Sequence, residues 1–527
     1  MKKYLFIALA ALGFAACAEN GEHNAPIQNG ELEQSYMAVT FTADDITRAA
    51  GDVYEEGREE ERAVKSAYVF FFEDGVAFPV AFDGTTSTNA GPNNYLKVNL
   101  TGDKQNMDNV SDVKDAVLVL QNYKGEYPNQ MVAVLNWEPK NAQYSLDELN
   151  AVVTTLGDDA NGYVMSNSVY ANKNNEKVDA VALAETNIGK TAEEALANPV
   201  TIHVERVAAK VEFTSVNNGL FEIGTIEDTV DNTETKVFAQ IKGFELYNDY
   251  QTSYLMKQID PKWDIDKIGF NWNDLSYFRS YWATSLTAAF PNNHFDWTNN
   301  NTAINGYVYC GENTRAWTEA DDVRTKVIVK ARLVKEDGVT PVEVVNWLGK
   351  EYVGENHLLT VVANTLKNTY FSGDGSTFVG LTPDDIKCVA RDPQDAKAYE
   401  VFFAVSDNSK TKTWYKYVNG DYKKIELDVI NKELAEVQPA HVYTEGMTYY
   451  WLDIKHLGKT GSTAEYGVVR NHVYNVNITD IEGFGTPVYD GVTDFIKPEK
   501  PDPITSYVSA QINILSWRVV DNNYELK

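Results

Sequence analysis

Apolar and polar residues alternate along most of this chain, the pattern of β-strands that bury one face. Near the N-terminus, Met37, Val39 and Phe41 alternate with smaller or polar neighbours. Residues 66–72, SAYVFFF, alternate in the same way, and residues 129–137, NQMVAVLNW, form the nearly continuous apolar run typical of a central strand. Similar patterns predict further strands at residues 202–213, 236–248, 324–334, 399–406, 447–454 and 466–479. The chain is therefore predicted to be mostly β.

Two short helices interrupt this pattern. Ser145 with Glu148, and Thr191 with Glu194, form capping boxes that each start an apolar helical face. The first helix is predicted to end at Gly157. No strand–helix–strand series is present in the sequence, which disfavours a parallel α/β fold.

The middle of the chain offers a domain boundary. Residues 202–213 break their alternation between Val204 and Val207, which predicts one strand with a β-bulge. Residues 214–234 are polar and turn-rich, and a second β pattern starts after them. We therefore expect two domains, which a length of 527 residues also favours.

The C-terminal stretch predicts one long strand of about fourteen residues, well beyond the usual strand length. It follows a proline-rich spacer at residues 497–503, and a bulge is expected near Ile514. Such a strand can reach a neighbouring molecule, or it can pack on its own domain. Its alternating apolar residues are Val508, Ala510, Ile512, Ile514, Leu515, Trp517 and Val519.

The N-terminal strand is predicted to be removable. It is followed by Arg48 and by the acidic, polar stretch 51–62. Exposed arginines in such segments are sites for trypsin-like proteases. The alternative is that Arg48 is a plain surface arginine, and Arg58 and Arg62 lie close by, so three arginines compete for the cut.

The first 17 residues have the form of a secretory signal peptide. Lys2 and Lys3 precede an apolar run, and Phe14-Ala15-Ala16 precedes Cys17 like a bacterial lipobox. The alternative is a plain signal peptide that ends near a cysteine. The run is too short to span a bilayer. Residues 18–34 are polar and predict a flexible tether.

Charge and candidate chemistry narrow the function classes. Asp plus Glu number 76 against 46 Lys plus Arg, and a net charge of −30 argues against nucleic acid as a partner. No zinc-protease, P-loop or nucleophile-elbow motif is present, and His472 is predicted to be structural. No catalytic residue, metal or cofactor is expected. A carboxylate pair for glycoside hydrolysis stays open, because its spacing is invisible in sequence.

The two cysteines and two acid-bearing loops can each be interpreted in two ways. Cys310 and Cys388 are expected to be buried free thiols, with pairing as the alternative. Residues 263–269 and 372–376 carry carboxylates and glycines in loops. Both are expected to be turns, with weak Ca²⁺ binding as the alternative.

Several segments together resemble a known family. They are the lipobox, the strand ending near Arg48, VERVAAKVEF, YVYCGENTRAW at 307–317, and above all YGVVRNHVYNVNITDIEGFGTPV at 466–488. They resemble the fimbrillins of Bacteroidales, the type V pilins, with the minor-fimbrium subunit branch as the best match.

The resemblance implies two transthyretin-like antiparallel β-sandwich domains. It also implies that Cys17 is acylated and that an arginine-specific protease cuts Arg48–Ala49. Residues 37–41 then leave, and the tail around residues 508–519 of a neighbouring subunit fills the groove. The implied segments are a leader at 1–17, a tether and removable strand at 18–48, domains at 49–220 and 221–503, and a donor strand at 504–527.

The predicted function is that of a structural shaft subunit of a surface fimbria that supports adhesion, with its precursor lipid-anchored in the outer membrane. Expected partners are copies of itself, accessory anchor and tip proteins, the protease, and host or bacterial surface receptors. The alternatives are an anchor or tip adhesin of the same fimbria, and a surface glycan-binding lipoprotein or glycosidase.

Overall fold

The computed structural model describes the greater part of the chain. The described residues are 32–42, 57–80, 93–98, 101–104, 113–123, 127–276, 278–290, 297, 302–314, 323–391, 399–489, 507–515 and 519–522. The leader with Cys17, the bond Arg48–Ala49, Trp517 and the spacer 497–503 lie outside them.

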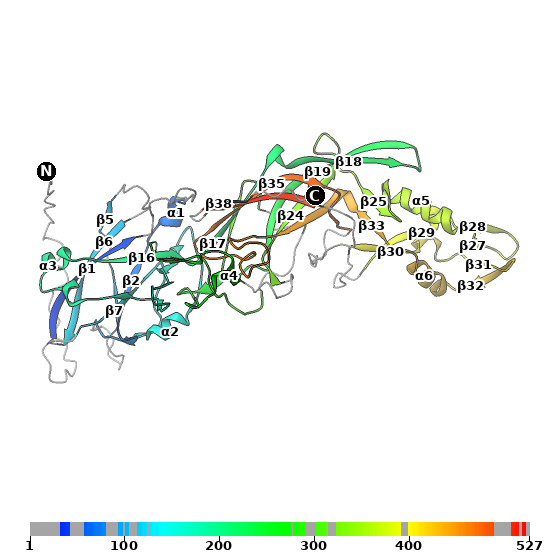
Figure 1. The fold of residues 1–527 in the computed structure, drawn as a ribbon. Coiled ribbons are helices and arrows are strands. Elements are labelled where there is room, and N and C mark those ends of the chain that lie inside the picture. The colour runs from blue at the N-terminus through cyan, green and yellow to red at the C-terminus, as the bar shows by residue number, and fades with distance from the viewer. Residues whose placement is uncertain are drawn as a thin grey trace.

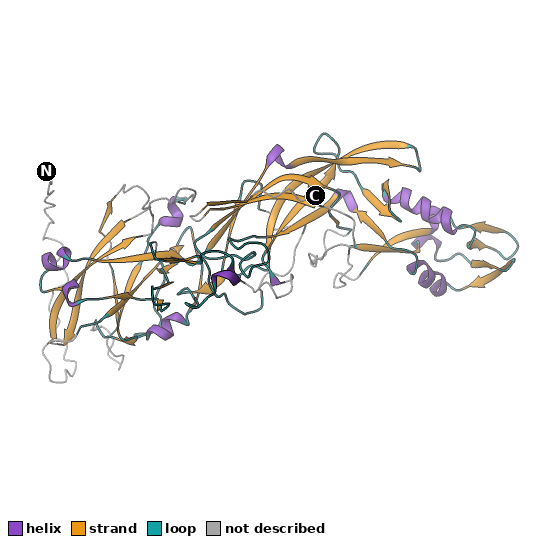
Figure 2. Ribbon diagram, viewed as in Figure 1, coloured by secondary structure: helices purple, strands orange, loops and turns teal. Residues whose placement is uncertain are grey.

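Strands dominate the structure and its helices are short, which confirms the mostly β fold class (Figure 2). The molecule is elongated, with one sheet at one end, a sandwich in the middle and a third unit at the other end (Figure 1). No described helix is both long and apolar enough to cross a membrane.

The first sheet has both faces buried. On β2, Ala67, Val69 and Phe71 enter one core and Tyr68 and Phe70 enter the other. The strand order is β3-β2-β7-β11-β16-β1-β6-β5, with β4, β14 and β15 attached beside this path. The bounds are β1 Leu32–Thr42, β2 Ala67–Glu73, β3 Val76–Ala77, β4 Tyr95–Lys97, β5 Thr101–Lys104, β6 Val113–Tyr123, β7 Gln130–Leu135, β11 Met165–Asn167, β14 Val181–Ala182, β15 Ile188–Gly189 and β16 Val200–Arg206.

The middle of the molecule is a β-sandwich. Its sheets have the orders β23-β17-β35-β37-β38 and β18-β19-β24-β34-β36, and their inner faces share one core. The pairs β1–β16 and β17–β35 are parallel, so the sheets are not antiparallel throughout. The bounds are β17 Ala209–Ser215, β18 Leu220–Asp228, β19 Thr233–Tyr247, β23 Tyr307–Cys310, β24 Lys326–Val334, β34 Met447–Asp453, β35 Val473–Glu482, β36 Thr486–Pro487, β37 Tyr507–Leu515 and β38 Val519–Asn522.

Residues 335–446, here called the insert, lie between the neighbouring strands β24 and β34. The insert has its own core, formed between two small sheets and two helices. The sheets are β26-β25-β33-β30-β29 and β28-β27-β31-β32. The bounds are β25 Val344–Trp347, β26 Lys350–Val353, α5 Glu355–Leu366, β27 Tyr370–Gly373, β28 Phe378–Gly380, β29 Ile386–Ala390, β30 Glu400–Val405, β31 Trp414–Val418, β32 Asp421–Ile425, α6 Leu427–Ala435 and β33 Ala440–Tyr443.

The remaining strands form two-stranded pairs, and the remaining α-helices are short. The two-stranded pairs are β8 Val153–Thr155 with β20 Thr252–Tyr254, β9 Gly157–Asp158 with β10 Gly162–Tyr163, β12 Tyr170–Ala171 with β13 Lys177–Val178, and β21 Asn273–Asp274 with β22 Arg279–Ser280. The short helices are α1 Glu59–Arg62, α2 Leu146–Asn150, α3 Ala192–Ala197 and α4 Ile265–Ile268.

The structure corrects two predicted elements in this part of the chain. Residues 202–213 are not one bulged strand, because β16 ends at Arg206 and β17 starts at Ala209 in another sheet. Both predicted capping residues are confirmed, at Ser145 and Thr191, but the full capping box forms only at Ser145, because Glu194 accepts from the Lys190 N–H. The first helix, however, ends at Asn150, because the residues after it form β8 and pair with β20.

Candidate assembly site

The N-terminal strand β1 lies inside the first sheet. It pairs antiparallel with β6 over all eleven of its residues, from Leu32 opposite Tyr123 to Thr42 opposite Val113. On its other side, residues 39–42 pair in parallel with residues 200–203 of β16. Among the described strands, β6 and β5 join the rest of the sheet only through β1. Removal of β1 would therefore divide the sheet.

Met37 anchors β1 in the core. Its side chain is fully buried and belongs to the same cluster as Leu118, Met131 and Ile202. Met37 stands opposite Leu118 of β6 in the register. The backbones of Val39 and Phe41 are paired on both sides. All three residues of the predicted removable strand, Met37 included, therefore lie within the sheet.

Sequence reasoning missed β6, the main partner of β1. Residues 113–123 carry the alternating signal, with Leu118 and Leu120 both buried in the core. The alternation itself could have predicted a strand here. It could not have predicted which strand pairs with β6, because pairing is not encoded in a local period.

After the expected cut, the described chain contacts the folded protein from Arg58 onward. The Arg58 guanidinium donates to the Asp159 carboxylate at 2.8 Å and to the Tyr309 hydroxyl at 2.8 Å, and it stacks over the Tyr307 ring. It also pairs with Glu61 at 3.1 Å. Arg62 ends α1 and is partly buried. Of the three competing arginines, two therefore belong to folded structure, and Arg48 lies outside the described residues.

Glu61 joins this segment to the sandwich. Its side chain is buried, pairs with Lys210 of β17 at 3.0 Å and accepts a hydrogen bond from the Tyr309 hydroxyl. The Glu61 carbonyl accepts from Arg206 Nε at 2.6 Å. Burial alone would raise the pKa of Glu61, but the contacts with Tyr309 and Lys210 outweigh it and hold this pKa below its usual value.

The C-terminal tail forms a hairpin, which corrects the prediction of one long strand. β37 pairs antiparallel with β35, and β38 folds back on β37 with Val519 opposite Leu515. The chain therefore reverses where a bulge near Ile514 was expected. The register places Val508 opposite Ile481, and it places Ala510, Ile512 and Ile514 opposite Ile478, Val476 and Tyr474. In this chain the tail packs on its own sandwich, at the edge of a sheet.

Two of the sequence motifs that carry the resemblance contact each other in the interior. Arg470 of VRNHVY pairs with Glu312 of YVYCGENTRAW at 2.7 Å, and both side chains are fully buried. Arg470 also donates to the Leu255 and Tyr254 carbonyls, at 3.0 and 2.6 Å. These motif residues form a polar anchor inside the fold.

His472 is buried and hydrogen-bonded, as predicted. Its Nδ1 lies 2.8 Å from the Arg470 carbonyl, which can only accept, so Nδ1 carries the proton. Burial and the nearby His456 hold the pKa of His472 well below its usual value. His456 in turn contacts the Tyr474 hydroxyl and the Tyr281 carbonyl.

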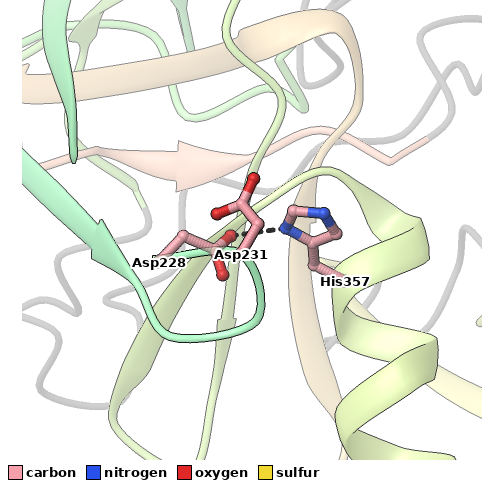
Figure 3. Close-up of side chains that lie close together, drawn as sticks. All are labelled: Asp228, Asp231 and His357. Carbon is pink, nitrogen blue, oxygen red and sulfur yellow. Dashed lines mark hydrogen bonds and ion pairs between the residues drawn. The ribbon is translucent and has the colours of Figure 1, made fainter. Parts of the chain in front are cut away.

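One cluster offers the donor atoms of a metal site. Asp228, Asp231 and His357 lie together where the β18–β19 hairpin meets the insert (Figure 3). His357 Nδ1 is 2.7 Å from Asp228 Oδ2, which is a hydrogen bond between the two ligands themselves. The same carboxylate accepts from the Val353 and Val230 backbone N–H groups. Asp228 is thus already held by three hydrogen bonds, two of which join the hairpin to the insert.

Of the two acid-bearing segments, residues 263–269 contain the short helix α4 instead of the expected turn, and residues 374–377 form a turn as expected. Asp264 caps α4 by accepting from the Asp266 N–H at 3.0 Å. Asp374 accepts from the Ser376 and Thr377 N–H groups, both at 2.8 Å. These carboxylates are occupied by their own backbone.

Both remaining cysteines are free and buried, which confirms the prediction. Cys310 belongs to the sandwich core and Cys388 to the insert core, so the fold keeps them apart. Burial, followed by the charge of Asp249, raises the pKa of Cys310 well above its usual value.

Comparison with known families finds one match in the C-terminal region. The model of the fimbrillin C-terminal region, described as major fimbrial subunit protein type IV, matches residues 441–523. No curated protein matches the chain. The matched residues include the VRNHVY motif, β35, β37 and β38.

Solved structures give distant likenesses. A fimbrilin from Porphyromonas gingivalis W83 shares 14% identity, covers 92% of this chain and 98% of its own, and has a TM-score of 0.35. A candidate cell adhesion protein from Parabacteroides distasonis shares 13%, with coverages of 91% and 96% and a TM-score of 0.35. The tip fimbrial protein Mfa3 from Porphyromonas gingivalis shares 12%, with coverages of 91% and 99% and a TM-score of 0.27. TM-scores this low do not support a conclusion about the function of this chain.

Proposed function

We propose that this chain is a shaft subunit of a bacterial surface fimbria, because the model of the fimbrillin C-terminal region matches its residues 441–523. The precursor is exported as a lipoprotein on Cys17, cut after Arg48, and polymerised by strand exchange. The role is structural and adhesive. The observation that supports it most directly is the position of β1, a strand at the N-terminal side of the cut that sits in the middle of a sheet.

Loss of β1 creates a vacancy that another strand would fill. The edges of β6 and β16 would lose their backbone partners, and such edges are templates for a matching strand. The core position that the Met37 side chain fills would also become exposed to water. Burial of one such side chain is worth about 1.5–3 kcal/mol, so several alternating residues of an incoming strand give a substantial driving force.

The donor proposed is β37 with its alternating Val508, Ala510, Ile512 and Ile514. β37 is nine residues long and, with β38, lies at the edge of its sheet, so its departure leaves the β35–β17 pairing in place. Insertion into a neighbour is head-to-tail, which extends a filament instead of closing a ring.

The cut is assigned to Arg48 because the competing arginines are engaged. A protease needs an extended, accessible segment. Arg58 is bound by Asp159, Glu61 and Tyr309, and Arg62 ends the helix that carries Glu61. Cleavage at either would require that contact with the sandwich to break first. The accessory anchor and tip proteins, the protease and surface receptors complete the proposed partners.

Arginine-specific digestion of the purified precursor tests the cut. Native gels are expected to show a ladder of polymers, and N-terminal sequencing is expected to begin at Ala49. The Arg48→Gln variant should stay uncut and monomeric, while the matched Arg58→Gln variant should be cut and polymerise. A ladder from Arg48→Gln, or a clipped protein that stays monomeric, would overturn the proposal.

A truncated chain that ends at Pro503 tests the donor. It keeps the strands β6 and β16 that flank β1 but lacks β37. After clipping it should therefore accept a donor strand from a neighbouring subunit but have no donor strand of its own to insert. Alone it should form no ladder, and mixed with clipped full-length protein it should shorten the polymers. Circular dichroism confirms that the truncated chain is folded. Polymers formed by the truncated chain alone would show that the donor lies elsewhere.

A further inference from the structure

The outermost sheet of the insert carries a cluster of aromatic rings on one face. β27, β28, β31 and β32 lie at the end of the molecule opposite β1 (Figure 1). We call this cluster the aromatic platform. Its members are Phe371, Phe378, Tyr415, Tyr417 and Tyr422.

The two faces of this sheet differ in their surroundings. Tyr370 and Trp414 point inward and belong to the insert core, where they pack with α5 and α6. Their neighbours Phe371 and Tyr415 alternate to the other face, and they stand opposite each other in the register. None of the hydrophobic clusters found among the described residues includes a platform ring. The platform is therefore not part of a core.

The rings hold one another in place. Phe378 and Tyr422 stack with centroids 3.9 Å apart and planes 2° from parallel. Phe371 meets Tyr422 edge-on at 4.9 Å, and Tyr415 meets Phe378 edge-on at 4.9 Å. Tyr417 lies 4.9 Å from Tyr422 and is 42% exposed. A surface fixed in this way loses little side-chain freedom when a ligand binds.

Two polar features of the platform indicate what it would bind. Among the described residues, no hydrogen bond engages the hydroxyls of Tyr415, Tyr417 or Tyr422. Lys424 stands opposite Tyr415 on the platform face, is exposed, and has no ion-pair partner within the described chain. By contrast, Lys416 on the inner face pairs with Glu433 of α6 at 2.7 Å.

We propose that the aromatic platform with Lys424 is a binding site for an acidic oligosaccharide. A pyranose ring presents a face of C–H groups that stacks on aromatic rings, and its hydroxyls can pair with the tyrosine hydroxyls at the platform surface. Lys424 is the charged residue that the strand register places on this face, so it complements a carboxylate or sulfate on the sugar. An amphipathic surface of this kind fits a sugar better than an aliphatic helix, which prefers an apolar groove.

The inference deepens the adhesive part of the proposed function and rests on it only for a place at the cell surface. It does not depend on cleavage or polymerisation. The uncut precursor is used for binding, so a failure here leaves the polymerisation experiments unaffected, and a failure there leaves this binding unaffected.

The binding experiment is an oligosaccharide array with sialylated, sulfated and uronic-acid sugars, each beside its neutral counterpart. Titration calorimetry then measures the best acidic sugar and its neutral counterpart. We expect an acidic sugar to bind the precursor and its neutral counterpart to bind about threefold more weakly, the effect of losing one exposed charge contact. Absence of any bound sugar, or equal binding of acidic and neutral sugars, would overturn the proposal.

Two variants locate the site, and a third is their control. Tyr422→Ala removes the ring at the centre of the platform and should weaken binding about tenfold or more, as truncation of a central aromatic contact does. Lys424→Gln should weaken the acidic sugar and leave its neutral counterpart unchanged. Lys423→Gln, on the opposite face of the same strand, should change neither.

Circular dichroism and thermal unfolding show whether each variant is folded, because ring pairs also stabilise a sheet. Tyr422→Phe, which keeps the stacking, is the second variant should Tyr422→Ala fail to fold, and it should lose only the hydroxyl contribution. Sugar binding that survives in folded Tyr422→Ala would contradict the assignment. Loss of self-association in that variant, with no sugar bound by the wild type, would instead identify the platform as a contact between copies.

Discussion

Arg470 Nη2 lies 2.7 Å from Glu312 Oε2, although the two residues are 158 positions apart in the chain. Neither side chain reaches solvent. Arg470 further binds the backbone carbonyls of Tyr254 and Leu255, so one guanidinium holds three distant segments together. Because a buried charge is stable only when it is paired and hydrogen-bonded, this contact should be critical for folding.

Glu312→Gln should therefore be strongly destabilising, since it leaves the Arg470 charge buried without a counter-charge. We expect the free energy of unfolding to fall by about 3–5 kcal/mol, measured by urea denaturation. The exposed pair Lys410–Asp407 is the matched control, and Lys410→Ala should leave stability nearly unchanged. A similar effect of both substitutions would contradict a special role for the buried pair.

Met37 should stabilise the precursor but not the polymer. Met37→Ala removes a fully buried side chain, so the unfolding free energy of the precursor should fall by about 2–5 kcal/mol. After clipping, residue 37 is gone, and the heat resistance of the polymer should equal that of the wild type.

Met131→Ala is the control for this prediction. Met131 is fully buried in the same core, but it lies on β7, which stays in the clipped subunit. That variant should weaken both the precursor and the polymer. A polymer weakened by Met37→Ala would mean that the strand does not leave.

His472 should make stability depend on pH below about 6.5. In the unfolded chain this histidine has its ordinary pKa of 6.5, whereas burial and then His456 keep its folded pKa far lower. Below pH 6.5 the unfolded chain therefore binds one more proton than the folded chain. Its contribution lowers the free energy of unfolding as pH falls, by up to about 1.4 kcal/mol per pH unit.

Urea denaturation of the wild type and of His472→Gln between pH 5 and pH 8 measures this contribution. The variant should lose the part of the slope that His472 causes, and above about pH 7 the two curves should run parallel. Identical slopes over the whole range would show that His472 accepts a proton in the folded protein.

The two buried thiols should report local unfolding. Burial, with Asp249 for Cys310 and Glu355 for Cys388, raises the pKa of each thiol, so little reactive thiolate exists at neutral pH. Iodoacetamide should label neither thiol in the native protein, as judged by peptide mass spectrometry. In urea, Cys388 should react before Cys310 if the insert opens by itself, because each thiol belongs to a separate core. Rapid labelling of either thiol without denaturant would contradict its burial.

Local features of the fold could be predicted from the sequence. The alternation of residues 37–41 predicted a strand with a buried face, and Met37 is buried as expected. Ser145 and Thr191 predicted two helix starts because a capping box satisfies backbone N–H groups within a few residues. The structural role of His472 followed from its place in an apolar alternation.

Contacts between distant segments were decided only by the tertiary structure. Val207 and Ala208 continue an apolar pattern, yet the chain passes between two sheets there. Likewise, the alternation over residues 508–519, with its phase shift near Ile514, predicted one bulged strand, yet the chain turns back on itself there. The pairing of β1 with β6, and of Arg470 with Glu312, has no local signature. A period records which face of a strand is buried, whereas its neighbour is chosen by the free energy of packing the whole chain.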